Sequence, residues 1–260
     1  MKLYAVTMMK DEEDVADLVL YHLASQGVDG IIVADNMSTD STSDKLHEAK
    51  KNLDIEVIIT QDDEIAYTQS EKMTRLGHQA AGRGATWIIP FDADELWFGV
   101  GGTLKEVLTQ ADADGKVSAK ADYWNHRITH EDVPGNPFTG MRYREKEFTG
   151  FYKAIYKYRR DITLSNGNHF IVPFDDDPFL GVVMRHFPLR SEEQFVKKMT
   201  NGYHACRALS KDHDLYNGAG WSPYFPVYEA EGVEGLKRVY QESYFNPEGF
   251  VYDPAPYKSN

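Results

Sequence analysis

Apolar and polar positions alternate in blocks along the first hundred residues, and these blocks predict a regular succession of strands and helices. Short apolar runs typical of buried strands cover residues 3–8, 30–34, 55–60 and 87–91. Apolar residues recur with helical spacing in residues 11–26, 41–51 and 68–82. Strands that alternate with helices form a parallel sheet with helices on both faces, so the pattern predicts an α/β fold.

The pattern changes after Gly101. Capping boxes at residues 103–106 and 191–194 begin two further helices, the second running through Leu209. Strand-like segments are predicted at residues 116–124, 151–158 and 181–186, and a last helix near residues 233–244. We expect one compact body, with a nucleotide-binding half over 1–100, an acceptor and catalytic half over 101–215, and a loop-rich tail over 216–260.

Composition narrows the range of partners. Of the 260 residues, 42% are hydrophobic, which suffices for a large core, and the net charge of −13 argues against a nucleic-acid or anionic membrane surface as the main partner. The single cysteine, Cys206, excludes an internal disulfide and a multi-cysteine metal site. No signal-type apolar segment opens the sequence, and no apolar run approaches the roughly 18 residues of a membrane span, so we expect a cytoplasmic protein.

The strand predicted at residues 87–91 ends in three carboxylates, Asp92, Asp94 and Glu95. Alternate residues of an extended chain point the same way, so Asp92 and Asp94 can direct both carboxylates to one point beyond the strand. Mg²⁺ and Mn²⁺ prefer such oxygen ligands and keep positions open for substrate phosphates. Taken alone, the same pattern also describes a solvated acidic turn.

A second polar segment follows the strand predicted at residues 30–34. Residues 39–42 are accounted for by a turn and a helix N-cap. Asp35 is explained less well in this way, because it lies at the very end of the strand, where an acceptor can contact a base or a ribose. Ligands of parallel sheets bind beyond the carboxyl ends of the strands, and both Asp35 and Asp92 are predicted there.

Motifs in a fixed order over residues 1–205 carry a family resemblance. They are Val6-Thr7, Asp11-Glu12, Gly27-Val28-Asp29, residues 35–42, residues 91–95, residues 101–104, Gly167-Asn168-His169 and residues 186–195. In this order they resemble the family 2 glycosyltransferases with the GT-A fold, in the bacterial and phage branch whose acidic motif reads Asp-Ala-Asp-Glu. Relatives often have Asn at the position of Asp11, and either side chain accepts hydrogen bonds from loop amides.

The resemblance implies a GT-A fold with a mostly parallel central sheet flanked by helices, and a site for a nucleotide-diphospho-sugar. Thr7 and Asp35 would line the nucleotide pocket, with Asp35 near the base. Glu12 and Asn36 would also belong to the donor site. The donor is expected to be a UDP- or GDP-sugar.

Metal binding is a further implication of the resemblance. Asp94 would coordinate Mn²⁺ or Mg²⁺ directly, and Asp92 would lie near the ribose and the water shell of the metal. His169 and His186 are candidates for a later metal ligand or a diphosphate contact, and an ordinary hydrogen-bonded histidine is the alternative for each. Arg190 could pair with a phosphate.

An inverting transfer needs a general base for the acceptor hydroxyl. Glu131 and Asp132 are candidates, with Glu95 as the rival beside the metal site, and the sequence does not decide among them. An exposed acidic loop is the alternative explanation for Glu131 and Asp132.

The sequence thus predicts a metal-dependent glycosyltransferase, with two alternatives. A nucleotidyltransferase would use similar carboxylates, but residues 7–12 are neither Gly-rich nor basic overall, as its phosphate loop usually is. The second alternative is a catalytically inactive module that binds a nucleotide-sugar. The acceptor could be a glycan, a lipid-linked sugar or a protein, nucleic acid is disfavoured, and self-association into a homo-oligomer stays open.

Overall fold

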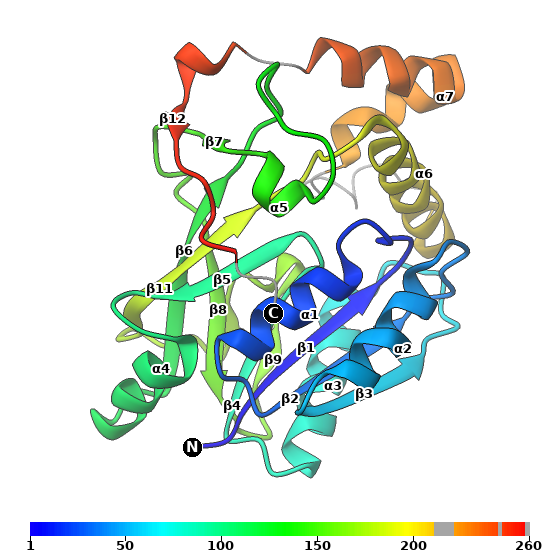
Figure 1. The fold of residues 1–260 in the computed structure, drawn as a ribbon. Coiled ribbons are helices and arrows are strands. Elements are labelled where there is room, and N and C mark those ends of the chain that lie inside the picture. Colours follow the sequence, from blue (N-terminus) through cyan, green and yellow to red (C-terminus); the bar gives the residue numbers. More distant parts are fainter. Residues whose placement is uncertain (211–220, 244–245, 258–260) are drawn as a thin grey trace.

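A curled eight-stranded sheet with helices on both faces forms the body of the protein (Figure 1). The computed structural model describes residues 1–210, 221–243 and 246–257. The strand order is β3-β2-β1-β4-β8-β6-β11-β5. This arrangement confirms the predicted α/β class with a mostly parallel central sheet. The predicted boundary between 215 and 216 lies outside the described residues.

The first half follows the predicted alternation closely. Its elements are β1 (Leu3–Met9), α1 (Ala16–Ser25), β2 (Gly30–Asp35), α2 (Thr42–Asn52), β3 (Glu56–Gln61), α3 (Gln69–Gly82) and β4 (Trp87–Pro90). All four strands run parallel. The first helix begins at Ala16 rather than at residue 11, because Asp11 has a left-handed backbone (φ 53°) and lies in a loop.

The second half adds mixed strands and two long helices. The main elements are β5 (Glu95–Gly99), α4 (Leu104–Ala113), β6 (Ser118–Asn125), β8 (Tyr152–Lys157), β11 (Phe179–His186), α6 (Glu192–Leu209) and α7 (Phe225–Glu242). Short elements are α5 (Pro137–Gly140), β7 (Tyr143–Arg144), β9 (Thr163–Leu164), β10 (Ile171–Val172) and β12 (Val251–Tyr252). The tail helix begins at Phe225, earlier than the predicted 233, and the predicted end at 244 falls outside the described residues.

Successive residues of the strands pack into two different cores. Leu3 and Ala5 of β1 face a core that also receives α1, α2 and α4, whereas Tyr4 and Val6 face a core under α3. A strand buried on both faces reads as a continuous apolar run, which is why the sequence predicted these strands. Both faces of the sheet are therefore covered by packed side chains, which leaves the edge formed by the carboxyl ends of the strands for ligand binding.

None of the helices in the described ranges combines the length and the apolar character needed to cross a membrane. Cys206 is buried in α6.

Two buried histidines make the stability of this fold depend on pH. Rings of His22 and His126 bond to the carbonyl oxygens of Trp97 (2.8 Å) and Met141 (3.0 Å). Burial lowers the pKa of each from 6.5 to about 4. The unfolded chain therefore binds more protons than the folded chain between these values. The contribution of the histidines to stability is fully present above pH 6.5 and is lost as the pH falls toward 4.

We expect the free energy of unfolding to fall by up to about 3 kcal/mol per histidine between pH 7 and pH 4. Urea unfolding at pH 7.5, 6, 5 and 4 measures this loss. The ring of His126 stacks on Phe187 at 4.3 Å, so His126→Phe keeps the packing and removes one titrating group. If the His126→Phe protein lost stability as steeply as the wild type, the assignment to His126 would be wrong.

Candidate functional site

The predicted acidic residues and the later histidine lie at one edge of the sheet. β11 is parallel to β6, and β8 is antiparallel to both β6 and β4, so β11 ends at the same edge as β4. Asp35 ends β2, Asp92 and Asp94 follow β4, and His186 ends β11. Helix α6 reaches this edge (Figure 1), and its Lys198 contacts Asp94.

Asp94 is the centre of a buried charged group that we call the Asp94 cluster, composed of Asp94, His186, Arg190 and Lys198. The antiparallel pairing of β5 with β11 sets His186 opposite Glu95 and thereby next to Asp94. Asp94 is only 2% exposed. Its Oδ2 contacts the Lys198 ammonium and lies 3.3 Å from His186 Nε2 and 3.6 Å from Arg190 Nη1. Burial opposes the charge of Asp94, but Lys198 and His186 outweigh burial and hold its pKa well below the usual range.

Arg190 connects the Asp94 cluster to the loop after β1. Its guanidinium bonds to Glu12 and, at 2.7 Å, to Asp14, and it donates to the carbonyl oxygen of Phe187 at 3.0 Å. The side chain is 1% exposed. These bonds occupy Arg190 within the protein, so its observed contacts are those of a positioning residue. The predicted donor residue Glu12 is likewise engaged in this ion pair.

His186 is held through its Nδ1, and its Nε2 faces Asp94. Nδ1 lies 2.9 Å from Asn125 Oδ1 and 2.5 Å from the Tyr123 hydroxyl, and the Asn125 amide is oriented by donating to Glu145 at 3.2 Å. With the hydrogen on Nδ1, the ring donates to the Asn125 oxygen and Nε2 presents a lone pair to the Asp94 carboxylate; with the hydrogen on Nε2, the ring donates to Asp94 instead. Burial lowers the pKa of His186, which favours a neutral ring. In the first tautomer, a cation between Nε2 and Asp94 would satisfy both.

This donor set fits Mn²⁺ or Mg²⁺ held by two protein ligands. In the described ranges no three His, Cys, Asp or Glu side chains converge on one point, so the protein alone does not offer a complete coordination sphere. A carboxylate and an imidazole whose other nitrogen donates to a fixed acceptor are a usual partial set for Mn²⁺. The remaining positions suit phosphate oxygens and water.

Asp92 belongs to a second group, which we call the Asp92 cluster: Asp92, Glu95, Lys153, Gln69 and Asn168. The Lys153 ammonium lies 2.7 Å from both Asp92 Oδ2 and Glu95 Oε1. Gln69 and Asn168 donate to Asp92 Oδ1 at 3.3 and 3.4 Å. Burial opposes the charge of Lys153, but Asp92 and Glu95 outweigh burial and raise its pKa. The two acids of the motif thus face different cations.

Glu95 is fully buried, and burial raises its pKa to about 8. It accepts from the backbone N–H of Asp92 (2.9 Å) and from the Trp97 indole (3.1 Å). These contacts are those of a structural residue that shapes the turn after β4.

The other two candidate bases lie in the loop between β6 and β7. Glu131 accepts from the Tyr143 hydroxyl at 2.6 Å, and Asp132 accepts from Thr129 at 2.8 and 3.0 Å.

The predicted nucleotide-pocket residues Thr7, Asp35 and Asn36 are all buried. Asp35 accepts from the N–H of Ser38 at 3.0 Å at the end of β2. Thr7 is completely buried within β1. Asn36 donates to the carbonyl oxygens of Asp62 and Glu64, each at 2.8 Å, and so fastens the loop after β3.

His169 does not lie in the Asp94 cluster. Its Nδ1 bonds to the carbonyl oxygen of Tyr152 at 2.8 Å, and its ring packs against Phe151 at 5.6 Å. Its neighbour Asn168 reaches Asp92, so His169 lies beside the Asp92 cluster. The geometry favours His186 over His169 as the histidine nearest a metal on Asp94.

Sequence reasoning missed Lys153 and Lys198, the cations that contact the two acids of the motif. Lys153 carried a signal, because it is a charged residue within a predicted apolar strand. Lys198 lies four residues after Gln194 and three before Asn201, on one face of α6, and this polar face is a weaker signal.

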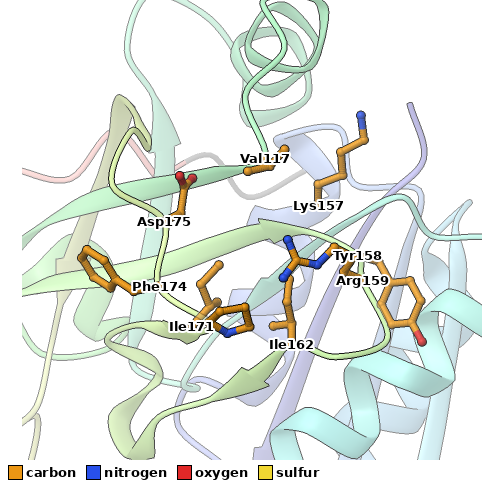
Figure 2. A pocket seen from close by; sticks show the side chains of 9 residues that line it. Val117, Lys157, Tyr158, Arg159, Ile162, Ile171, Phe174 and Asp175 are labelled. Atoms are coloured by element: carbon orange, nitrogen blue, oxygen red, sulfur yellow. The ribbon is translucent and has the colours of Figure 1, made fainter.

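The cavity in Figure 2, about 280 Å³, is not this site. Val117 precedes β6, and Lys157 ends β8 opposite Trp87, the first residue of β4. The cavity therefore opens at the other edge of the sheet.

No protein-family model matches this chain, and no curated protein matches it. Among solved structures, the S. aureus TarS fragment 1–349 with UDP is similar at 14% identity, over 86% of this chain and 74% of that one, with a TM-score of 0.42. A mannosyltransferase from Pyrobaculum calidifontis with GDP-Man and Mn²⁺ is similar at 13% identity, over 93% and 73%, with a TM-score of 0.43. Glucosyl-3-phosphoglycerate synthase from Mycobacterium tuberculosis is similar at 14% identity, over 60% and 56%, with a TM-score of 0.36.

Proposed function

We propose that this protein is a glycosyltransferase that moves a sugar from a nucleotide-diphospho-sugar to an acceptor hydroxyl, with a divalent metal at Asp94 and His186. One observation carries the proposal. The Asp94 carboxylate and His186 Nε2 face each other at 3.3 Å, at the edge of the sheet where Asp35 ends β2, one strand away from β4 across β1. A metal–diphosphate group and a nucleoside need these two sites side by side.

The chemistry explains why such a pair is needed. Transfer releases a nucleoside diphosphate, and negative charge grows on the leaving oxygen. When bound, Mn²⁺ or Mg²⁺ supplies Lewis-acid stabilisation of that charge. Asp94 and His186 would hold the metal, Asn125 would accept from Nδ1 of His186 in the tautomer that leaves Nε2 unprotonated, and Arg190 fixes the cluster to the loop after β1. Asp92 would lie beside the ribose.

Contacts of the loop after β1 favour this function over nucleotidyl transfer. The N–H groups of Asp11 and Glu12 already donate to Ser38 (3.1 Å) and Thr42 (2.8 Å). Lys10 donates to the carbonyl oxygens of Asn36 (3.0 Å) and Met37 (2.9 Å). These loop groups are engaged within the protein, whereas a phosphate loop presents its N–H groups to the ligand.

The donor and the stereochemistry rest on the family resemblance, which implies a UDP- or GDP-sugar and inversion at the anomeric carbon. Glu131 or Asp132 as the base, and action in the cytoplasm on a glycan, lipid-linked or protein acceptor, are expectations from the sequence itself. Burial raises the pKa of Asp132, a direction that suits a general base near neutral pH.

A thermal-shift screen of UDP-, GDP- and TDP-sugars, each with and without Mn²⁺, tests the proposal. A ligand at 100 times its Kd adds about 2.7 kcal/mol of stability, which moves the melting temperature by several degrees. We expect at least one donor to raise the melting temperature, more with Mn²⁺ than without, and to be hydrolysed slowly. Binding without hydrolysis or transfer would instead identify an inactive module, and a panel without any shift would contradict donor binding.

A further inference from the structure

Lys198 lies against the atom that a metal on Asp94 would use. Its ammonium contacts Asp94 Oδ2, the same oxygen that lies 3.3 Å from His186 Nε2. The position is set by α6, which Ser191 caps by accepting from the N–H of Gln194 at 3.1 Å. The protein thus places its own cation beside the two proposed metal ligands.

The two cations of the Asp94 cluster differ in how firmly they are held. Arg190 is 1% exposed and also bonds to Glu12 and Asp14. Within the described ranges, Asp94 is the hydrogen-bonded and ion-paired partner of Lys198, whose side chain is 20% exposed. Lysine is a flexible point charge, whereas the guanidinium of Arg190 is fixed by several bonds. Lys198 is therefore the cation that can exchange partners.

We infer that Lys198 occupies Asp94 in the free protein and moves to the diphosphate of the donor when the metal binds, so that metal and diphosphate bind cooperatively. This inference rests on the proposed function. A metal that binds alone must displace Lys198 and leave an unpaired cation at a largely buried site, which is unfavourable. A diphosphate gives the displaced ammonium a new anionic partner, so each ligand favours the binding of the other.

The matched control is the preceding residue of the same helix. Lys197 pairs with Glu13 (2.8 Å), Glu193 (3.3 Å) and Asp40 (3.6 Å), and not with Asp94. The wild type, Lys198→Ala, Lys198→Arg and Lys197→Ala are compared by calorimetric titration. Mn²⁺ is titrated alone and with saturating UDP or GDP, and UDP or GDP is titrated with and without Mn²⁺. Melting temperatures establish that each variant is folded.

Opposite changes in the two affinities are the signature of this exchange. In Lys198→Ala we expect Mn²⁺ alone to bind about tenfold more tightly, the nucleotide to bind about tenfold more weakly, and the coupling between them to fall. Lys198→Arg keeps a cation, so its affinities for Mn²⁺ and nucleotide should remain closer to those of the wild type. The affinities of Lys197→Ala should equal those of the wild type.

If the wild type bound Mn²⁺ with a nucleotide but Lys198→Ala left the affinity for Mn²⁺ alone unchanged or lowered, the exchange would be wrong and the proposed function would stand. If the wild type bound neither UDP nor GDP with Mn²⁺, the proposed function itself would fail, and the exchange with it.

Discussion

Asp94→Asn should lower the rate of donor hydrolysis and sugar transfer at least about 100-fold at saturating donor. Asparagine keeps the shape of the side chain but removes the charge that faces His186 Nε2 at 3.3 Å. Because the metal would stabilise charge that develops only as the diphosphate leaves, its loss should affect turnover more than nucleotide affinity. Turnover measured over a range of Mn²⁺ and donor concentrations checks this expectation.

Folding of the Asp94→Asn protein can be judged separately. Arg190 keeps its bonds to Glu12 and Asp14, so the cluster stays fastened to the loop after β1 when the charge of Asp94 is removed. The exposed Asp63 offers a control, since Asp63→Asn also removes one negative charge near this edge but should leave turnover unchanged. An Asp94→Asn enzyme with full Mn²⁺-dependent turnover would show that the metal assignment is wrong.

The elements that the sequence predicted well are those whose packing is repetitive. Strands β1 to β4 are buried on both faces, so each is a run of apolar residues, and each intervening helix buries one apolar stripe. Strand β5 was missed because its pairing with β11 joins residues far apart in the sequence, and no local sequence pattern predicts this pairing. The late start of α1 follows from the bonds of Asp11 to Thr39 and Asn201, which are equally non-local.

Prediction of the site was also limited by contacts between residues that are far apart in the sequence. Alternation along an extended chain suggested that Asp92 and Asp94 share one point, yet the turn after β4 directs them to different cations, Lys153 and Lys198. That the ends of β2 and β4 lie at one edge of the sheet, on either side of β1, could be foreseen because both strands belong to the regular first half. His186 lies next to Asp94 because β11 pairs with β5, two strands far apart in the sequence. The sequence alone therefore left His169 and His186 as equal candidates for the metal or diphosphate contact.

The pairing of Lys153 leads to the largest stability effect that we expect. Its ammonium lies 2.7 Å from two carboxylates, Asp92 and the fully buried Glu95, and is itself only 5% exposed. Lys153→Met keeps the length of the side chain and removes the charge, which leaves Asp92 without its cation and Glu95 without the donor that faces its Oε1. We expect a loss of about 3–5 kcal/mol in the free energy of unfolding, measured by urea denaturation.

A comparison within the same strand separates burial from charge. Lys157, at the end of β8, also lies 2.7 Å from an acid, Asp112, but its side chain is 44% exposed, so Lys157→Met should cost less than about 1 kcal/mol. Adding Glu95→Gln to Lys153→Met removes one of the unpaired acids and should restore part of the lost stability, because contacting residues are energetically coupled. Equal stabilities of the two lysine variants, or no recovery in the double variant, would contradict the role given to Lys153. The expected asymmetry follows from solvation: the side chain of Asp112 is 28% exposed, so water can replace Lys157 beside it, whereas the side chain of Glu95 is 0% exposed.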